Sequence, residues 1–214
     1  MFRCLKMESL PLFLAASIAL IVTPGPDILY VLSRGIAEGK WAGVMSAWGV
    51  TCGIFVHTLA ASLGLAVLLS TSRTAFVGIK LAGGLYLIYL GWQMIVSRKG
   101  IDLNGAAQKV GLKMCCVQGF VTNVLNPKVA LFFVAFLPQF VRPDAPSHAL
   151  AMIGLGLMFA LMTVVFLTIL GLAAGSIGLW LQARHKAASI LPLASGGLIM
   201  ALGLSLLFPC ASRP

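Results

Sequence analysis

The feature that most constrains the fold is a helix break inside an apolar segment. Residues 9–33 have the composition of a membrane helix, but Pro24, Gly25 and Pro26 interrupt it. Proline lacks the backbone N–H that a helix needs, and the residue before it favours an extended backbone. Asp27 follows, at a depth where a charge is costly in a bilayer. Since the freed backbone groups need protein or water as partners, we interpret the break as half of a solute-binding site in a small secondary transporter.

The composition indicates an integral membrane protein. The chain has 214 residues, of which 60% are hydrophobic and 9% are charged, whereas soluble domains carry about 25% charged residues. We expect a single transmembrane domain over 1–214, in contact with membrane lipid. The net charge of +10 does not indicate nucleic-acid binding, because the basic residues cluster between apolar spans, as topology signals and anionic-lipid contacts do. The cysteines show no metal-ligand or disulfide spacing, so neither a metal nor a cofactor is expected.

The hydropathy pattern predicts an all-α membrane fold with six spans. They are expected at about 9–33, 41–69, 75–96, 115–141, 149–175 and 187–208. The fourth span, like the first, is broken at a proline, Pro127, and Pro138 suggests a second disturbance. Each half, about 7–97 and 114–209, thus begins with a broken span, and a linker over 98–113 joins the halves. Three spans per half invert the second half relative to the first, and inverted repeats with paired broken helices indicate a solute site near the membrane midplane.

Positive charges in the connections predict the orientation. The connections on the side of the linker carry eight lysines and arginines, and the other side carries five. The positive-inside rule then places the linker in the cytoplasm and both termini outside. The first span follows basic residues, as in a signal peptide, but no small-x-small cleavage site follows it, so we expect it to be retained. The chain could start at Met1 or at Met7.

The two breaks are expected to form one site for a zwitterion. At each break one half-helix exposes N–H groups with partial positive charge, and the other exposes carbonyls with partial negative charge. An amino acid carries one carboxylate, which Lys128 or a half-helix N-terminus could hold, and one ammonium, which Asp27 or freed carbonyls could hold. The predicted substrate-binding residues are Thr23, Pro24, Gly25, Asp27, Asn123, Asn126 and Lys128.

Uphill transport needs a coupling ion. No G-x-x-x-x-G-K-[ST] nucleotide-binding motif occurs in the sequence, so protons are the simplest driver, carried by Asp27 or His57. Structural roles compete with these functions. Asp27 could only cap the second half-helix, Lys128 could pair with Asp27 or extend to the membrane interface, and His57 could be a hydrogen-bonded packing residue.

Small residues and prolines are candidates for helix packing or gating. Gly39 and Gly43, and again Gly49 and Gly53, are four residues apart, which lets another backbone approach closely and also permits a homodimer. The candidates for packing or gating are Gly39, Gly43, Gly49, Gly53, Pro26, Pro127 and Pro138.

With these residues assembled, the chain resembles the LysE/RhtB family of amino-acid exporters. The resemblance rests on residues 23–27, Arg34, the four glycines and His57 in the first half, and on residues 126–128, 132–133 and 136–140 in the second. It implies a bacterial inner-membrane exporter of amino acids or their derivatives that works by proton antiport and is not an enzyme. Family members export lysine, arginine, threonine, homoserine, homoserine lactone, leucine or cysteine-pathway metabolites, and no residue here picks among them.

Other functions find less support in the sequence. A metal-cation exporter, as in distant relatives of this family, would need several acids or thiols facing a pore. Asp27 is the only acid clearly inside a span, and Cys52, Cys115 and Cys116 are not at ligand spacing. A membrane enzyme would need a convergent acid–base set, for which only Asp27 and His57 are available. A scaffold would leave both helix breaks unexplained.

Overall fold

The computed structural model describes residues 10–71, 73–97, 110–142, 145 and 147–177, and the isolated residues 193, 196, 197, 199–201, 203, 204 and 207. Within this part the chain is helical and no β-strand occurs. The elements are α1 (Leu10–Val22), α2 (Pro26–Glu38), α3 (Lys40–Thr71), α4 (Arg73–Ser97), α5 (Leu112–Val124), α6 (Pro127–Leu131), the π-helix η3 (Phe132–Phe136), the 3-10 helix η4 (Leu137–Phe140) and α7 (His148–Leu172). The expected start at Met1 or Met7, most of the linker over 98–113 and most of the sixth span lie outside the described residues.

The first predicted break is confirmed. Helices α1 and α2 meet at a bend of 48°, and Pro26 occupies the first position of α2, where its missing N–H would be unpaired in any case. Helix α2 continues to Glu38, past the expected end of the span near residue 33, so the polar residues that follow are helical and not a loop.

The second predicted break is confirmed as well. Helix α5 and the segment Pro127–Phe140 also meet at 48°, and Pro127 begins α6. The disturbance expected at Pro138 is present, because the chain passes from α6 into the π-helix η3 and then into the 3-10 helix η4, which contains Pro138.

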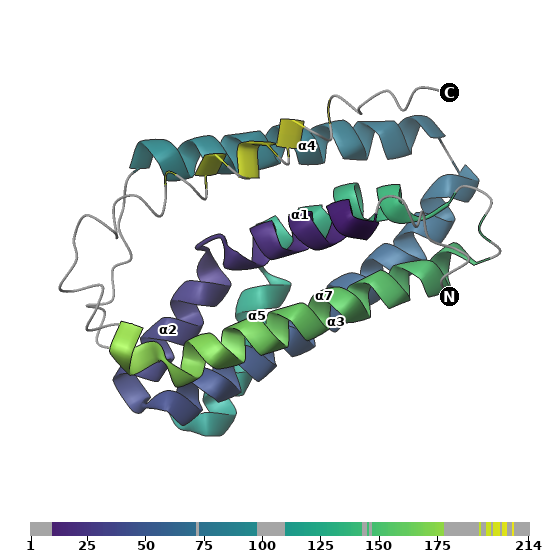
Figure 1. Ribbon diagram of the computed structural model, residues 1–214. Helices are drawn as coiled ribbons and strands as arrows, with labels where there is room; N and C mark the ends of the chain where they lie inside the picture. Colours follow the sequence, from purple (N-terminus) through teal and green to yellow (C-terminus); the bar gives the residue numbers. More distant parts are fainter. Residues whose placement is uncertain are drawn as a thin grey trace.

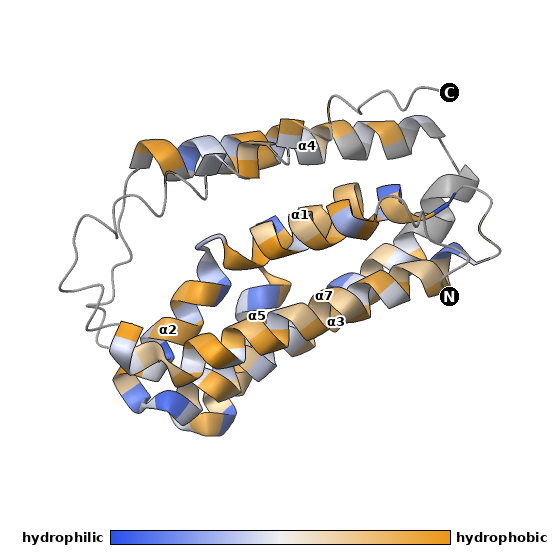
Figure 2. Cartoon of the chain, in the orientation of Figure 1, coloured by the Kyte–Doolittle hydropathy of each residue, from blue (hydrophilic) through white to orange (hydrophobic). Residues whose placement is uncertain are grey.

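The helices form a bundle around α3. Helix α3 packs most extensively against α5 and α7, and Figure 1 shows α3 and α7 side by side, with α4 on the far side of α1. By length and hydropathy, α3 and α7 can each cross a membrane, and each bent pair can form one further span. Many residues along the helices are hydrophobic in Figure 2, and large hydrophobic side chains are exposed on several helices, for example Leu63 at 66% and Leu161 at 65%. Such a surface fits the hydrocarbon of a bilayer.

Three glycines of the α3 ridge allow close helix contacts. A Cβ on Gly43 would lie 2.8 Å from the Cα of Gly171 on α7, and a Cβ on Gly49 would overlap the carbonyl oxygen of Cys116 on α5. On Gly53 it would lie 2.6 Å from Oδ1 of Asn123. Since these faces are filled by helices of the same chain, they do not offer the homodimer interface that the sequence suggested.

Gly39 has a different role from the packing or gating role expected for it. No atom lies within 4 Å of a Cβ built on Gly39, and its φ is +95°. It is the C-cap of α2, where a backbone conformation open to glycine ends the helix. The four-residue spacing to Gly43 therefore does not reflect a continuous ridge.

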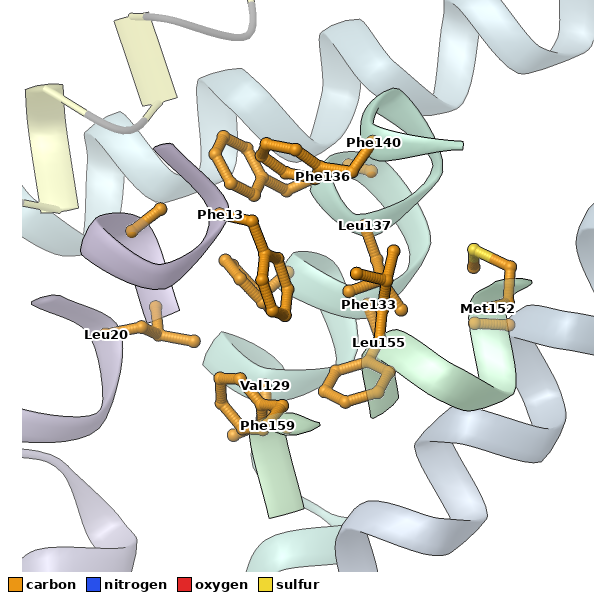
Figure 3. Close-up of a cluster of buried hydrophobic side chains, with 14 of the residues drawn as sticks. Phe13, Leu20, Val129, Phe133, Phe136, Leu137, Phe140, Met152, Leu155 and Phe159 are labelled. Carbon is orange, nitrogen blue, oxygen red and sulfur yellow. The ribbon is translucent and has the colours of Figure 1, made fainter. Parts of the chain in front are cut away.

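A phenylalanine cluster fixes the segment after the second break. The ring of Phe132 stacks on Phe136 with centroids 5.0 Å apart and lies 5.3 Å from Phe159 of α7. Phe13 of α1 meets Phe140 edge-on at 5.4 Å, and Figure 3 shows Phe13, Phe136 and Phe140 close together in the same apolar cluster as Phe159. Because α6 directly precedes this cluster, the packing positions α6 against the end of α1.

We expect Gly49→Ala to destabilise the protein by about 1–3 kcal/mol, because the new methyl group would overlap the α5 backbone. The measurement is equilibrium unfolding in mixed micelles. Gly64→Ala, on the same helix with nothing within 4 Å of the added Cβ, is the matched control and is expected to be neutral or stabilising. Equal stability of the two variants would contradict the close contact.

Candidate functional site

Asp27 lies in the first turn of α2 and is held by two amides from the other half of the chain. Its Oδ2 accepts hydrogen bonds from Nδ2 of Asn123 at 2.9 Å and from Nδ2 of Asn126 at 3.0 Å. The side chain is buried, and it does not cap its own helix, because the N-cap of α2 is Gly25 and makes no side-chain cap bond. The hypothesis that Asp27 serves only as a cap is therefore wrong.

Lys128 occupies the equivalent position in the second break, directly after Pro127, the first residue of α6. Its Nζ donates to the carbonyl oxygens of Leu20 and Thr23, each at 3.0 Å. These carbonyls belong to the end of α1, where the helix leaves acceptors unpaired and carries partial negative charge. Lys128 is buried and does not extend to an interface. Among the described residues Arg34 and Glu38 form an ion pair, whereas Lys128 and Asp27 are not in direct ion-pair contact.

The remaining residues at the breaks complete the backbone hydrogen bonding. Asn126 is the N-cap of α6, and its Oδ1 accepts from the backbone N–H of Lys128 at 3.1 Å. Thr23 donates its hydroxyl to the carbonyl oxygen of Ala19 at 2.6 Å. A Cβ on Gly25 would lie 3.1 Å from Nζ of Lys128, so the glycine leaves room for the lysine. Pro24 separates the end of α1 from this glycine.

His57 joins the site through Asn123. Its Nε2 lies 2.9 Å from the carbonyl oxygen of Asn123, and because a carbonyl only accepts, Nε2 carries the proton. The imidazole is buried, and its ring lies 6.0 Å from the ring of Phe133. His57 thus fixes the end of α5, from which Asn123 reaches Asp27.

A small cavity of about 20 Å³ lies at the breaks, with room for about one water. Asp27, Asn123 and Lys128 supply polar groups to its wall. The apolar lining residues are Leu20, Ile21, Ile28, Ile54, Val129, Phe159 and Leu167, and Thr163 completes the lining. Oδ1 of Asp27 and Oδ1 of Asn123 are buried without a hydrogen-bond partner. The site therefore contains two unused acceptors next to a lysine that uses two of its three N–H donors.

A second polar cluster joins the other ends of α2 and α5. Arg34 donates to Oε1 of Glu38 at 2.8 Å and to Oε1 of Gln118 at 2.7 Å. Oε2 of Glu38 accepts from the backbone N–H groups of Val110 and Gly111 at 3.0 and 3.1 Å. Sequence reasoning missed this cluster, although the four-residue spacing of Arg34 and Glu38 is the pattern of a helical ion pair.

The described residues contain no group of three or more His, Cys, Asp or Glu side chains that could hold a metal ion. The polar groups at the breaks are instead one carboxylate, one ammonium and two amides. These groups suit an organic zwitterion better than a metal cation.

Two bent helix pairs meet at a small cavity whose mostly apolar wall also carries a carboxylate, an ammonium and an amide, an arrangement typical of membrane transporters with broken helices. The family model for LysE type translocators matches residues 18–209, and the chain belongs to this family.

Among its relatives, the homoserine/homoserine lactone efflux protein of Salmonella typhimurium is 31% identical over 89% of this chain and 92% of its own length. The leucine efflux protein of Klebsiella pneumoniae is 26% identical, over 83% of this chain and 84% of its own. An uncharacterised membrane protein of Pseudomonas aeruginosa is 29% identical, over 87% and 88%. No solved structure matches the chain.

We expect Asn126→Ala to destabilise the protein by about 2 kcal/mol, because it removes the N-cap of α6 and one donor to Asp27. Asn126→Ser restores a cap acceptor without the donor and is expected to recover about 1 kcal/mol of that loss. Unfolding in mixed micelles measures both. No difference between the two variants would mean that the cap contributes little.

Proposed function

We propose that this protein is a secondary-active exporter of amino acids or close derivatives across the bacterial inner membrane, driven by proton antiport. The observation that carries the proposal is the pair of opposite charges, Asp27 and Lys128, at one buried cavity between two broken helices. Relatives named as homoserine/homoserine lactone and leucine efflux proteins support an amino-acid substrate. On this proposal the two halves are inverted repeats, and both termini lie outside.

The substrate ammonium binds at the unused acceptor of Asp27. Oδ1 of Asp27 and Oδ1 of Asn123 have no partner, and a buried acceptor left unpaired is costly. An ammonium brings three donors and compensates the charge of Asp27. Asp27 lines the cavity, so its Oδ1 is the acceptor that an ammonium in the cavity can reach, whereas Oδ1 of Asn123 lies against Gly53 of α3.

The substrate carboxylate binds at Lys128. Its Nζ gives two hydrogen bonds to the end of α1 and has one N–H left. A carboxylate accepting this N–H would form a charge-assisted bond in a buried site. The backbone carbonyls of Leu20 and Thr23 hold the ammonium of Lys128 in place, so the lysine is positioned before the substrate arrives.

Competition at Asp27 provides the coupling. The carboxylate of Asp27 can accept a proton or hold the substrate ammonium, and protonation removes the charge that binds the ammonium. A proton arriving from outside therefore releases the amino acid there, and loss of that proton to the cytoplasm restores the site. His57 does not line the cavity and holds Asn123, so it positions the site while Asp27 carries the proton.

The cavity has room for about one water, so substrate can enter only when the helices around the breaks separate. The structure corresponds to a closed state on this proposal. The direct test is a counterflow screen of the purified protein in liposomes, over amino acids and their lactones. Exchange of at least one of them is expected, and exchange of none would contradict the proposal.

Asp27→Asn is expected to abolish uphill efflux driven by a pH gradient while the protein remains in the membrane. The amide cannot take up the coupling proton, although it keeps the shape of the side chain. Substrate-dependent proton movement, read with a pH-sensitive dye in the liposomes, measures the effect. His57→Gln is the matched comparison and should keep coupling, because its amide can still donate to the carbonyl of Asn123. Uphill efflux by Asp27→Asn at the wild-type level would exclude Asp27 as the coupling residue.

Lys128→Gln is expected to raise the apparent KM for substrate about 10-fold to 100-fold, because a hydrogen bond to a charged group is lost. Initial rates of counterflow over a range of concentrations give the KM. Lys40→Gln, at an exposed residue, is the control and should leave KM unchanged. A lower protein level with an unchanged KM would show that Lys128 acts only on structure.

A further inference from the structure

One face of α7 forms a wall of the cavity. Phe159, Thr163 and Leu167 are spaced by four residues, which places them along one face of a helix. All three line the cavity and are at most 5% exposed. Helix α7 carries neither of the breaks, so this wall is separate from the groups that bind the two charges.

The hydroxyl of Thr163 is the polar lining group that the two charged ends of an amino acid leave unused. Asp27 is assigned to the ammonium and Lys128 to the carboxylate, the amide of Asn123 faces Asp27 and α3, and the other lining residues are apolar. The hydroxyl proton of Thr163 is donated to the carbonyl oxygen of Phe159 at 2.9 Å. Its oxygen therefore remains available only as an acceptor.

Phe159, Thr163 and Leu167 carry no charge, and this limits the side chain that the substrate can place against them. A cationic side chain would need a second carboxylate and an anionic one a second cation, because an unpaired charge is costly in a buried site. Asp27 and Lys128 are the acid and the base of the cavity lining, and both are occupied by the ends of the amino acid. The wall thus fits an uncharged side chain that carries at most one hydroxyl donor.

We propose that Thr163 is a specificity-determining residue that accepts a hydrogen bond from a hydroxyl on the side chain of the transported amino acid. Phe159 and Leu167 enclose the carbon atoms on either side. This inference rests on the proposed function, since it concerns the same site. It assigns the protein to small, uncharged, hydroxyl-bearing amino acids in preference to apolar ones of the same carbon skeleton.

The test compares homoserine with 2-aminobutyrate, which has the same carbon skeleton and lacks the hydroxyl. The purified protein in liposomes is assayed by counterflow, and the quantity compared is the ratio of kcat/KM for the two amino acids. Wild-type protein is expected to favour homoserine about fivefold to tenfold, as for one neutral hydrogen bond. Thr163→Val, which has nearly the same shape, is expected to bring the ratio close to one, and Thr163→Ser should keep the preference.

The matched control is Thr51→Val on α3. Thr51 is buried and makes the same kind of bond, to the carbonyl oxygen of Ala47 at 2.8 Å, but it does not line the cavity. The ratio of kcat/KM for homoserine and 2-aminobutyrate in Thr51→Val should equal that of the wild-type protein. The ratio is measured within each variant, so it does not depend on the amount of folded protein.

The outcomes separate the two proposals. A Thr163→Val variant that transports 2-aminobutyrate and keeps the wild-type preference for homoserine would overturn the role of Thr163 and leave the exporter proposal intact. A wild-type preference for 2-aminobutyrate would overturn it as well. Wild-type protein that exchanges no amino acid would contradict the proposed function and this assignment with it.

Discussion

The structure depends on each broken helix being completed by the other half of the chain. The ammonium of Lys128 binds the carbonyls at the end of α1, and the amides of Asn123 and Asn126 bind the carboxylate of Asp27. Neither break is self-sufficient, since a helix end in lipid has no water to complete its hydrogen bonds. The same hydrogen bonds that stabilise the breaks also bring a carboxylate, an ammonium and two amides together around one cavity. Folding and binding therefore use one set of groups.

The rest of the packing places the helix ends at the two breaks next to each other. Glycines on α3 let α5 approach closely enough for Asn123 to meet Asp27, and His57 holds the end of α5 from the same helix. On the other side, the phenylalanine cluster keeps η3 against α7 through Phe132 and Phe159 and η4 against α1 through Phe140 and Phe13. The polar site is thus bordered by rigid apolar contacts, which suits a site that has to select its ligand by small differences in position.

The positions of the two helix breaks could be predicted from the local sequence. The hydrogen-bond partners of the residues at the breaks depend instead on tertiary contacts. Proline acts on its own helix, so the breaks before Pro26 and Pro127 could be located from the sequence. The partners of Lys128 depend on how α6 sits on α1, and sequence reasoning did not anticipate the carbonyls of Leu20 and Thr23. Gly39 was misjudged because a spacing of four residues does not distinguish a packing glycine from a helix terminator. Thr163 gave no signal, since a single threonine in an apolar span matches no pattern.

The contact of Glu38 with the backbone of Val110 and Gly111 links α2 to the second half of the chain. Those residues lead into α5, so the carboxylate fastens the far end of α2 to the start of the second half. Helix α2 has 13 residues and is about 20 Å long, with Asp27 in its first turn and Glu38 at its last residue. One continuous helix therefore has Glu38, which is bonded to the start of the second half, at one end and the carboxylate of Asp27 at the other.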